Sequence, residues 1–228
     1  MKSLDELIPP TTTFSMVVRD EKTGWFGAAV SSAAPAVGAV CSFVRAGVGA
    51  ICSQSFVNSE LGRKGLDLIG NGLDVEAALR VQLDRDPHAE YRQIIGIDRV
   101  RTYAFTGSRC VKWHGSLEEK DFAVAGNMLV SEQVIEEMCR SLQQTPEEDL
   151  AERLLKGLEA GQAAGGDKRG KQSAAILIGS DATQWHHNLR VDDHPDPIIE
   201  LRRVYNATIS TIQRFRKQFE GLESIIQL

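Results

Sequence analysis

The sequence lacks features that would each indicate a particular class of protein. No apolar run approaches the length needed to cross a membrane, and the first residues, MKSLDELIPP, contain Asp5 and Glu6 and no apolar stretch typical of a secretory signal. Basic residues are in the minority, at 26 Lys and Arg against 31 Asp and Glu, which gives a net charge of -5. A nucleic-acid-binding surface requires the opposite balance. We therefore expect a cytoplasmic protein that binds neither membranes nor nucleic acids.

Cysteine is also scarce, and its spacing excludes common metal and disulfide frameworks. The four cysteines, Cys41, Cys52, Cys110 and Cys139, form no CxxC pair and lie within apolar segments. Zinc sites and disulfide-rich domains both require closely spaced cysteines. We expect these four thiols to be reduced and buried in the core.

The length and composition favour one globular domain. A chain of 228 residues with 42% hydrophobic residues can bury one sizeable core, and no internal repeat or low-complexity linker divides it. We assign residues 1–228 to a single domain. Within it, residues 1–12 form an N-terminal extension and residues from about 198 to 228 form a C-terminal helix.

The first third of the chain alternates between strand and helix patterns. Residues 13–19 alternate apolar and polar side chains, and a DEKTG turn leads to a return strand at 25–32, which predicts a hairpin. A second hairpin is expected within residues 37–56, turning at 45–47. Helical periodicity follows from Asn58, and Asp74 is placed to cap a helix over Val75–Leu83.

The remaining elements come in groups of strands and pairs of helices. Strands are predicted at 93–98, 101–107, 110–115, 121–127, 172–180 and 184–191, and helices at 131–142, 146–161 and from 197 onward. Such grouping is not strict βαβ alternation. It predicts an α+β fold, specifically a four-layer α-β-β-α sandwich of two mainly antiparallel sheets, with a simpler two-layer α+β fold as the alternative.

A glycine-rich segment at residues 161–178, GQAAGGDKRGKQSAAILI, is the least ordinary stretch of the chain. It places Asp167 and Arg169 between glycines and leads into Gln172 and Ser173 at the start of a buried strand. Such a loop can gather backbone N–H groups and charged side chains at one end of a sheet. Its spacing does not match a phosphate-binding P-loop, and we expect no cofactor.

Several motifs together resemble one known family. These motifs are TFSMVVRD…TGWFGAAVSS, VGAV, RAGVGAICSQSFVN, GRKGLDLI, AVAGNML, LAERLLKGLEAGQAAGGDKRGKQSAAILI and LRVDDHPDPIIELRR. From Thr13 to about Leu201 the chain resembles the family called domain of unknown function 1028. That family is placed in the superfamily of N-terminal-nucleophile (Ntn) hydrolases, with proteasome subunits and penicillin acylase. The resemblance implies a four-layer sandwich and hydrolysis of an amide bond, and it assigns no substrate.

Thr13 occupies the position of the nucleophile that the resemblance implies. In such enzymes the α-amino group of the first residue, with an ordinary pKa near 8, removes the proton from the hydroxyl of that same residue. Here twelve residues precede Thr13, so its nitrogen is an amide until the bond after Thr12 is cleaved. The flexible glycine usual before such a nucleophile is replaced by Thr12. The alternative is that the threonine run merely starts a strand, which β-branched residues favour.

The resemblance also suggests companions for Thr13. We expect Ser31 (or its neighbour Ser32), Arg45, Asn127 and Asp167 to act in catalysis. Arg45 would replace a lysine near the nucleophile, Asn127 would donate its amide N–H to an oxyanion, and Asp167 would orient the amine. Substrate contacts are expected from Gln54, Arg169, Gln172 and Ser173. The structural alternatives are a surface turn for Arg45, an Asx turn or helix cap for Asn127, and an internal ion pair between Asp167 and Arg169.

A histidine-rich segment, WHHNLRVDDHPDP, raises the question of a metal site. His186, His187, Asp192, Asp193 and His194 offer suitable ligand atoms. Adjacent residues on a strand point to opposite faces, so the first two histidines cannot readily share one ion. We therefore favour a turn, followed by Asp196 capping the last helix with Pro197 at its first position, and expect no metal.

The sequence leaves three functional hypotheses. The leading one is a latent Ntn-type amidohydrolase centred on Thr13, with a small-molecule substrate. The alternative is a catalytically inactive protein of the same fold that binds a small polar or anionic ligand. A third is self-assembly through the apolar C-terminal helix, and we expect a homodimer or a higher homo-oligomer in any case.

Overall fold

The computed structural model describes residues 13–180 and 186–219, which form a mixed α+β fold with two antiparallel sheets. The six-stranded sheet contains β1 (Thr13–Arg19), β2 (Phe26–Ser32), β7 (His114–Glu118), β8 (Phe122–Asn127), β9 (Ser173–Gly179) and β10 (His187–Val191), in the order β10-β9-β2-β1-β8-β7. The four-stranded sheet contains β3 (Ser42–Arg45), β4 (Gly49–Ser55), β5 (Arg92–Asp98) and β6 (Thr102–Thr106), in that order. The helices are α1 (Val37–Val40), α2 (Ser59–Gly70), α3 (Val75–Leu83), α4 (Gln133–Gln144), α5 (Leu150–Ala163) and α6 (Pro197–Gln218), with a short 3₁₀ helix, η2, at Ala89–Tyr91.

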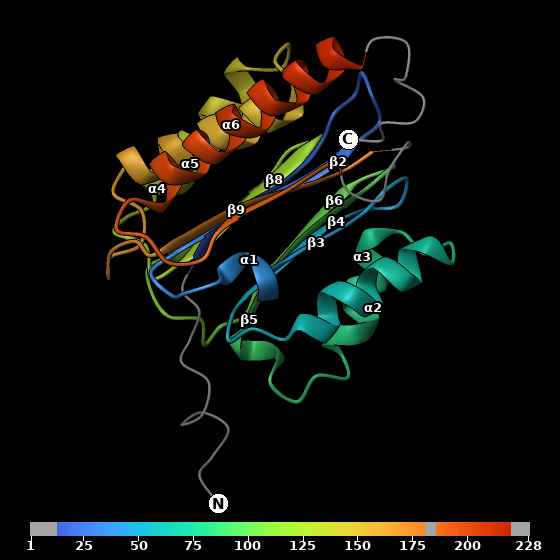
Figure 1. Ribbon diagram of the computed structural model, residues 1–228. Coiled ribbons are helices and arrows are strands. Elements are labelled where there is room, and N and C mark those ends of the chain that lie inside the picture. Colours follow the sequence, from blue (N-terminus) through green and yellow to red (C-terminus); the bar gives the residue numbers. More distant parts are fainter. Residues whose placement is uncertain (1–12, 181–185, 220–228) are drawn as a thin grey trace, which may run out of the picture.

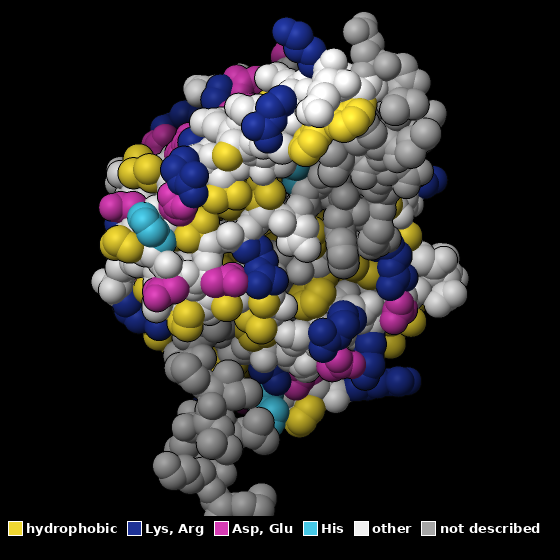
Figure 2. Space-filling model, viewed as in Figure 1, with side chains coloured by type: hydrophobic (Ala, Val, Ile, Leu, Met, Phe, Trp, Pro, Cys, Tyr) yellow, Lys and Arg dark blue, Asp and Glu magenta, His cyan; other side chains and the backbone are white. Residues whose placement is uncertain are grey.

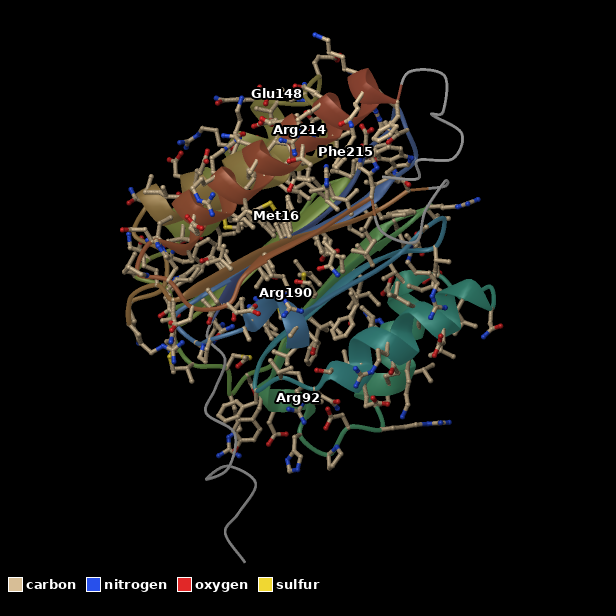
Figure 3. The ribbon with its side chains drawn as sticks, in the orientation of Figure 1. Met16, Arg92, Glu148, Arg190, Arg214 and Phe215 are labelled. Atoms are coloured by element: carbon tan, nitrogen blue, oxygen red, sulfur yellow. The ribbon has the colours of Figure 1, made fainter. Side chains whose placement is uncertain are left out.

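The first hairpin shows how the sequence pattern produces the sheet. Along β1, Phe14, Met16 and Val18 face the helices, as Figure 3 shows for Met16, which lies between the sheet and α4–α6. The turn after β1 is closed by the carboxylate of Asp20, which accepts a hydrogen bond from the Thr23 backbone N–H at 3.2 Å. This confirms the predicted hairpin.

Apolar contacts divide the molecule into successive layers (Figure 1). Helices α4, α5 and α6 pack on the outer face of the six-stranded sheet, where residues such as Met16, Met138 and Leu154 are fully buried. The inner faces of the two sheets meet through Val17, Phe26, Ala28, Ile95, Ile97 and their neighbours. Helices α2 and α3 cover the outer face of the four-stranded sheet. The candidate site lies at one end of the inner layer, between the two sheets.

Side chains at three helix starts accept hydrogen bonds from backbone N–H groups, and one of these caps, Asp74, was predicted from the sequence. The Asp74 carboxylate accepts from the Ala77 backbone N–H at 2.9 Å, which confirms the cap of α3. Asn58 and Asp149 occupy the same position in α2 and α5.

Three local predictions differ from the structure. Residues 37–40, expected to be strand, form α1, and Gly38 packs so closely on β9 that an added Cβ would lie 2.3 Å from the Cβ of Ala175. The strand expected at 110–115 begins only at His114. Asp196 does precede α6, with Pro197 in the first turn, yet its carboxylate pairs with Lys171 and makes no cap hydrogen bond.

The predicted N-terminal extension, residues 1–12, lies outside the described residues, as does the predicted continuation of the last helix beyond Phe219. On the face shown in Figure 2, basic and acidic side chains are interspersed. None of the helices in the described ranges combines the length and hydropathy that a bilayer-spanning segment requires.

Candidate functional site

Strand register brings several polar residues together at one end of the six-stranded sheet, called here the Thr13 end. Thr13 is opposite Ser32 on β2, and Ser32 is opposite Ser173 on β9. On the other side of β1, Phe14 pairs with Gly126, so the next residues of the two strands, Thr13 and Asn127, lie at adjoining strand ends. All four polar residues are at most 1% exposed.

These residues share the face that looks toward the second sheet. Side chains alternate along a strand, and Val17 of β1 and Ala125 of β8 belong to the layer between the sheets. Thr13 is four residues from Val17, and Asn127 is two residues from Ala125. Because both separations are even, Thr13 and Asn127 lie on the same face as these two residues. The layer between the sheets is therefore apolar along most of its length and polar at the Thr13 end.

The glycine-rich loop holds Asp167 against this end. Leu129 and Asp167 form an isolated β-bridge, and the Lys168 backbone N–H donates to the Met128 carbonyl at 3.0 Å. One Asp167 carboxylate oxygen accepts from the Ala33 backbone N–H at 3.3 Å, just beyond the end of β2. Asp167 thus lies at the ends of both strands that flank β1, and it is only 3% exposed.

Arg169 pairs with Asp167 from the same loop. Its Nη2 lies 3.1 Å from Asp167 Oδ2, and its backbone N–H donates to Oδ1 at 2.9 Å. Gly166 and Gly170 have φ values of +62° and +119°, so the tight turn that forms this pair depends on glycine. The ion pair considered from the sequence is present, with one third of the Arg169 side chain exposed.

Three buried amide side chains connect the two sheets beneath Thr13. Gln54 Nε2 donates to Gln93 Oε1 at 2.7 Å, and Asn127 Nδ2 donates to the same oxygen at 3.1 Å. Gln93 Nε2 lies within 3.0 to 3.1 Å of Thr106 Oγ1 and of the carbonyl oxygens of Gly115 and Gly126. Gln54, Gln93 and Asn127 are each 0% exposed.

A thiol completes this network. Cys41 Sγ donates to Gln54 Oε1 at 3.9 Å. A hydrogen bond with Cys52, together with burial, raises the pKa of Cys41 well above its ordinary value, so the thiol stays protonated and remains a donor. This agrees with the expectation that these cysteines are buried thiols.

Asn127 Oδ1 and Ser15 Oγ are among the buried polar atoms that have no hydrogen-bond partner among the described residues. A buried acceptor or donor left without a partner typically costs about 1–3 kcal/mol of folding free energy. Both residues lie on the inner face at or near Thr13. Polar groups that destabilise the fold in this way are candidates for a functional role.

The register shows that Ser32, and not Ser31, is the serine beside Thr13. Ser31 is opposite Phe14, and Ser32 is the residue opposite Thr13 on the inner face. Ser31 Oγ donates to the Ser173 carbonyl at 3.2 Å, and Ser173 Oγ donates to the Ala34 carbonyl at 2.5 Å. Ser31 and Ser173 therefore help to join β2 and β9.

Arg45 is far from Thr13, and the expectation that the two residues are neighbours is wrong. Arg45 pairs with Gly49 and Gly49 with Asp98, whose carbonyl accepts from Arg19 at 3.3 Å. Arg19 ends β1, six residue steps of about 3.3 Å from Thr13, or roughly 20 Å along the strand. Arg45 instead binds Asp67 at 2.5 Å and the Leu66 carbonyl at 3.2 Å on α2.

The other predicted contacts divide between the interior and the surface. Gln54 lies in the buried amide network, whereas the Gln172 side chain donates to Asp193 at 3.0 Å near the surface. The sequence did not single out Gln93, and it favoured Ser31 over Ser32 as the companion of Thr13. Strand alternation could have placed Gln93 on the inner face, because it lies two residues before Ile95 in a predicted strand.

The described residues of the histidine segment make ring contacts and an ion pair. The rings of His186 and His187 are 4.6 Å apart, and His187 contacts Tyr205 edge-on at 5.6 Å. Asp192 pairs with Arg190 at 2.8 Å. Within residues 13–180 and 186–219, no group of three metal-binding side chains is found.

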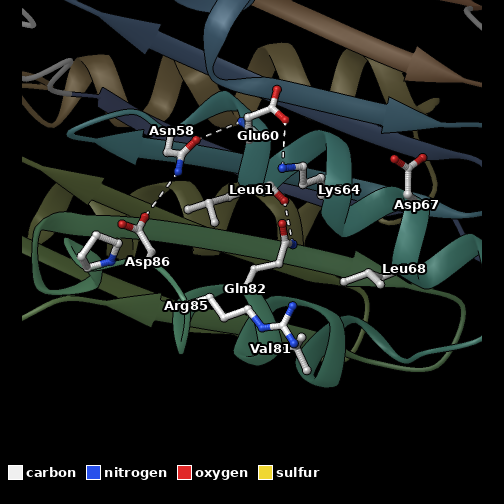
Figure 4. A pocket seen from close by; sticks show the side chains of 11 residues that line it. Asn58, Glu60, Leu61, Lys64, Asp67, Leu68, Val81, Gln82, Arg85 and Asp86 are labelled. Carbon is white, nitrogen blue, oxygen red and sulfur yellow. Dashed lines mark hydrogen bonds and ion pairs between the residues drawn. The ribbon is translucent and has the colours of Figure 1, made fainter.

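A hollow of about 480 Å³ lies between α2 and α3, away from the Thr13 end (Figure 4). Its polar groups bind one another: Asn58 Nδ2 donates to Asp86 Oδ2 at 3.4 Å, and Gln82 Nε2 donates to the Leu61 carbonyl at 3.1 Å. This hollow contains none of the predicted site residues.

Comparison with known proteins identifies the family. A model of the "family of unknown function (DUF1028)" matches residues 13–201. The crystal structure of a Silicibacter pomeroyi protein of that family is similar to this chain, with a TM-score of 0.80 and 28% identity over 86% of this chain and 89% of the other. Anbu (ancestral beta-subunit) from Yersinia bercovieri aligns with a TM-score of 0.45 and 12% identity over 92% of this chain and 99% of the other. No curated protein matches. The chain belongs to the family of unknown function DUF1028.

Proposed function

We propose that this protein is an amide-bond hydrolase of the Ntn type, with Thr13 as its nucleophile once the peptide bond between Thr12 and Thr13 has been cut. The proposed fold is the four-layer α-β-β-α sandwich of that class. One observation supports the proposal most: Thr13 begins β1 at the polar end of an otherwise apolar layer, next to Ser32, Asn127 and Asp167.

The proposed reaction uses only atoms of Thr13 and water. The hydroxyl oxygen bonds to the substrate carbonyl carbon while the free α-amine accepts the hydroxyl proton. The C–N bond then breaks, and the ammonium group returns that proton to the leaving nitrogen. Water attacks the resulting ester in the same way and releases the acid, and Thr13 recovers its hydroxyl.

Removal of the first twelve residues is a necessary part of the proposal. While Thr12 is attached, the nitrogen of Thr13 is an amide, which is not basic. Self-cleavage would proceed by attack of the Thr13 hydroxyl on the Thr12 carbonyl carbon. The acyl group moves from nitrogen to oxygen, and water then hydrolyses the ester. The match to the family begins at Thr13, which is compatible with a cut at this place.

Asp167 and Ser32 are the companions that we propose for Thr13. The Asp167 carboxylate accepts from Arg169 and from the Ala33 backbone N–H, and these bonds hold it in one orientation. A carboxylate at the strand end can favour the ammonium form that arises during each step. Arg169, with one third of its side chain exposed, is the proposed contact for a polar or anionic substrate group.

Intact mass and covalent labelling test this proposal. The mass of the purified protein shows whether the chain begins at Thr13. A second preparation carries a protease recognition sequence in place of the residues before Thr13, and it is cut after folding. A β-lactone is then added, since its strained ester acylates an activated hydroxyl. We expect a Thr13 adduct in the cut chain and none in the uncut chain or in Thr13→Ala. Equal labelling of cut and uncut chains would contradict the mechanism.

Binding without catalysis is the second candidate, favoured by the complete burial of Thr13. In that case Arg169 and its neighbours would hold a small polar or anionic ligand. Such a ligand would raise the melting temperature equally in the wild-type protein and in Thr13→Ala. Loss of the shift in Thr13→Ala alone would argue against this candidate.

A further inference from the structure

We propose that Asn127 Oδ1 is the hydrogen-bond acceptor for the α-amine of Thr13 in the cut chain, and that Gln93 is the positioning residue that turns this oxygen toward the amine. This inference rests on the proposed function. It assigns a purpose to the unpartnered Asn127 oxygen and to a buried glutamine that the sequence did not single out.

Two backbone carbonyls fix the orientation of Gln93. The carbonyl oxygens of Gly115 and Gly126 can only accept hydrogen bonds, and both lie within 3.1 Å of one terminal atom of the Gln93 amide. That atom must be the nitrogen. The Gln93 oxygen therefore faces the opposite way, toward Gln54 and Asn127.

The orientation of Gln93 then determines that of Asn127. The amide group of Asn127 has one atom 3.1 Å from Gln93 Oε1. Because an oxygen there would repel the Gln93 oxygen, that atom is Nδ2, and Oδ1 is turned away. Gln54 obeys the same constraint, and its own oxygen accepts from the protonated Cys41 thiol. Among the described residues, only Oδ1 of Asn127 is left without a partner in this series.

The location of Asn127 matches that of the future amine. Gly126 pairs with Phe14, so Asn127 and Thr13 lie side by side at the ends of adjoining strands and on the same face. Cutting the bond before Thr13 converts its nitrogen from an amide to an amine with additional N–H groups. Asn127 Oδ1 can accept one of them.

This hydrogen bond has a chemical consequence for the base. A neutral amine has two N–H groups and one lone pair, and it accepts the hydroxyl proton through the lone pair. If one N–H is held by Asn127, the lone pair is left to point toward the Thr13 hydroxyl. The sequence suggested that Asn127 donates to an oxyanion. The network instead uses Nδ2 for Gln93 and offers the carbonyl oxygen, so an acceptor role fits the structure better.

The pKa of the Thr13 α-amine tests the inference without a known substrate. The cut chain is acetylated with a trace of acetic anhydride at a series of pH values, and the mass of its N-terminal peptide gives the amine pKa. In Asn127→Asp, a carboxylate replaces the carbonyl oxygen, and we expect the amine pKa to rise by about one unit or more. The matched control is Asn188→Asp, an exposed asparagine on β10, for which we expect almost no change.

A second variant tests the positioning role. Gln93→Met keeps the size of the side chain but cannot hold the Asn127 amide, so Asn127 can turn its N–H toward the amine. We expect the amine pKa to fall by about half a unit or more. If Asn127→Asp does not fold, this variant alone decides the matter. An amine pKa that is unchanged in Gln93→Met, or equal in Asn127→Asp and Asn188→Asp, overturns the inference.

The outcome is separate from that of the proposed function. Absence of the β-lactone adduct would reject Thr13 as a nucleophile, yet the amine would still titrate and the shifts would still be measurable. Conversely, Thr13 could be labelled by the β-lactone while its amine pKa stays unchanged in Asn127→Asp and in Gln93→Met. That result would support the hydrolase proposal and reject the role of Asn127.

Discussion

The layer between the two sheets has two unlike ends. At the Arg19 end it is filled by Phe26, Val17 and Ile97, all 0% exposed. The charged groups there are paired: Arg19 binds Asp121, and the Asp98 carboxylate accepts from the Val75 backbone N–H at 2.6 Å. At the Thr13 end the same layer contains hydroxyls and amides, and the Asp167 carboxylate lies at the strand ends. Asn127 Oδ1 and Ser15 Oγ in this layer have no partner among the described residues.

The difference separates residues that stabilise the fold from residues that are better explained by function. Apolar side chains at the Thr13 end would avoid the cost of burying polar groups. Proteins usually bury polar groups without partners only at functional sites. The Thr13 end is therefore where chemistry is expected, and the Arg19 end is where stability is expected.

Substitutions in the inner layer should produce the largest contrast. Phe26→Ala opens a cavity at the Arg19 end and should lower the free energy of unfolding by about 3–5 kcal/mol. Ser15→Ala removes an unpartnered hydroxyl beside Val30 and Ala125, and should leave that free energy unchanged or raise it by up to about 1 kcal/mol. Urea unfolding measures both.

A large loss of stability in Ser15→Ala would break this comparison. It would mean that the Ser15 hydroxyl has a hydrogen-bond partner, and that its burial does not lower the stability of the fold.

Several features of the two ends depend on residues close together in the chain and could be predicted from the sequence. Alternation predicted β1, the glycine-rich loop predicted a charged group at a sheet end, and Asp74 predicted its helix cap. These features depend on residues close together in the chain. The resemblance of the motifs pointed to the family that the comparison then identified.

The predictions of which residues lie beside Thr13 were wrong where the answer depends on the pairing of strands that are distant in the sequence. Ser31 and Ser32 are neighbours in sequence, and only the pairing of β1 with β2 shows that Ser32 is the one opposite Thr13. The resemblance implied that Arg45 takes the place of a lysine near Thr13, but the turn after β3 lies at the Arg19 end of the molecule, opposite the Thr13 end. Alternation could place Gln93 on the inner face, but its hydrogen-bond partners lie on two sheets, and only the pairing of distant strands reveals them.

Low pH should destabilise the protein at the Arg19 end, because a buried histidine, His187, lies there on the outer face of the six-stranded sheet. His187 pairs with Ile178, and burial, followed by the charge of His186, lowers its pKa from 6.5 to about 4. The unfolded chain then binds a proton at a higher pH than the folded one. The stability that the neutral ring contributes is complete above about pH 6.5 and decreases as the pH falls toward 4.

We expect the wild-type protein to lose on the order of 2 kcal/mol between pH 7.5 and pH 4.5 through this residue, with allowance for partial solvent screening. Urea unfolding at the two pH values, in the wild type and in His187→Gln, measures it. His88→Gln, on the surface, is the matched control. An equal pH dependence in His187→Gln and in the wild type would show that His187 does not carry the effect.

The smallest expected effect bears most directly on the separation of the two ends. Arg45 and Asp67 are 37% and 59% exposed, so Arg45→Ala should cost less than about 1 kcal/mol. It should leave β-lactone labelling of Thr13 unchanged in the cut chain, because the two residues lie at opposite ends of the strands. Arg169→Ala, which frees the carboxylate of Asp167 from its partner, should reduce that labelling several-fold. Comparable losses in the two variants would mean that the ends are coupled through the inner layer, and the assignment of chemistry to one end alone would fail.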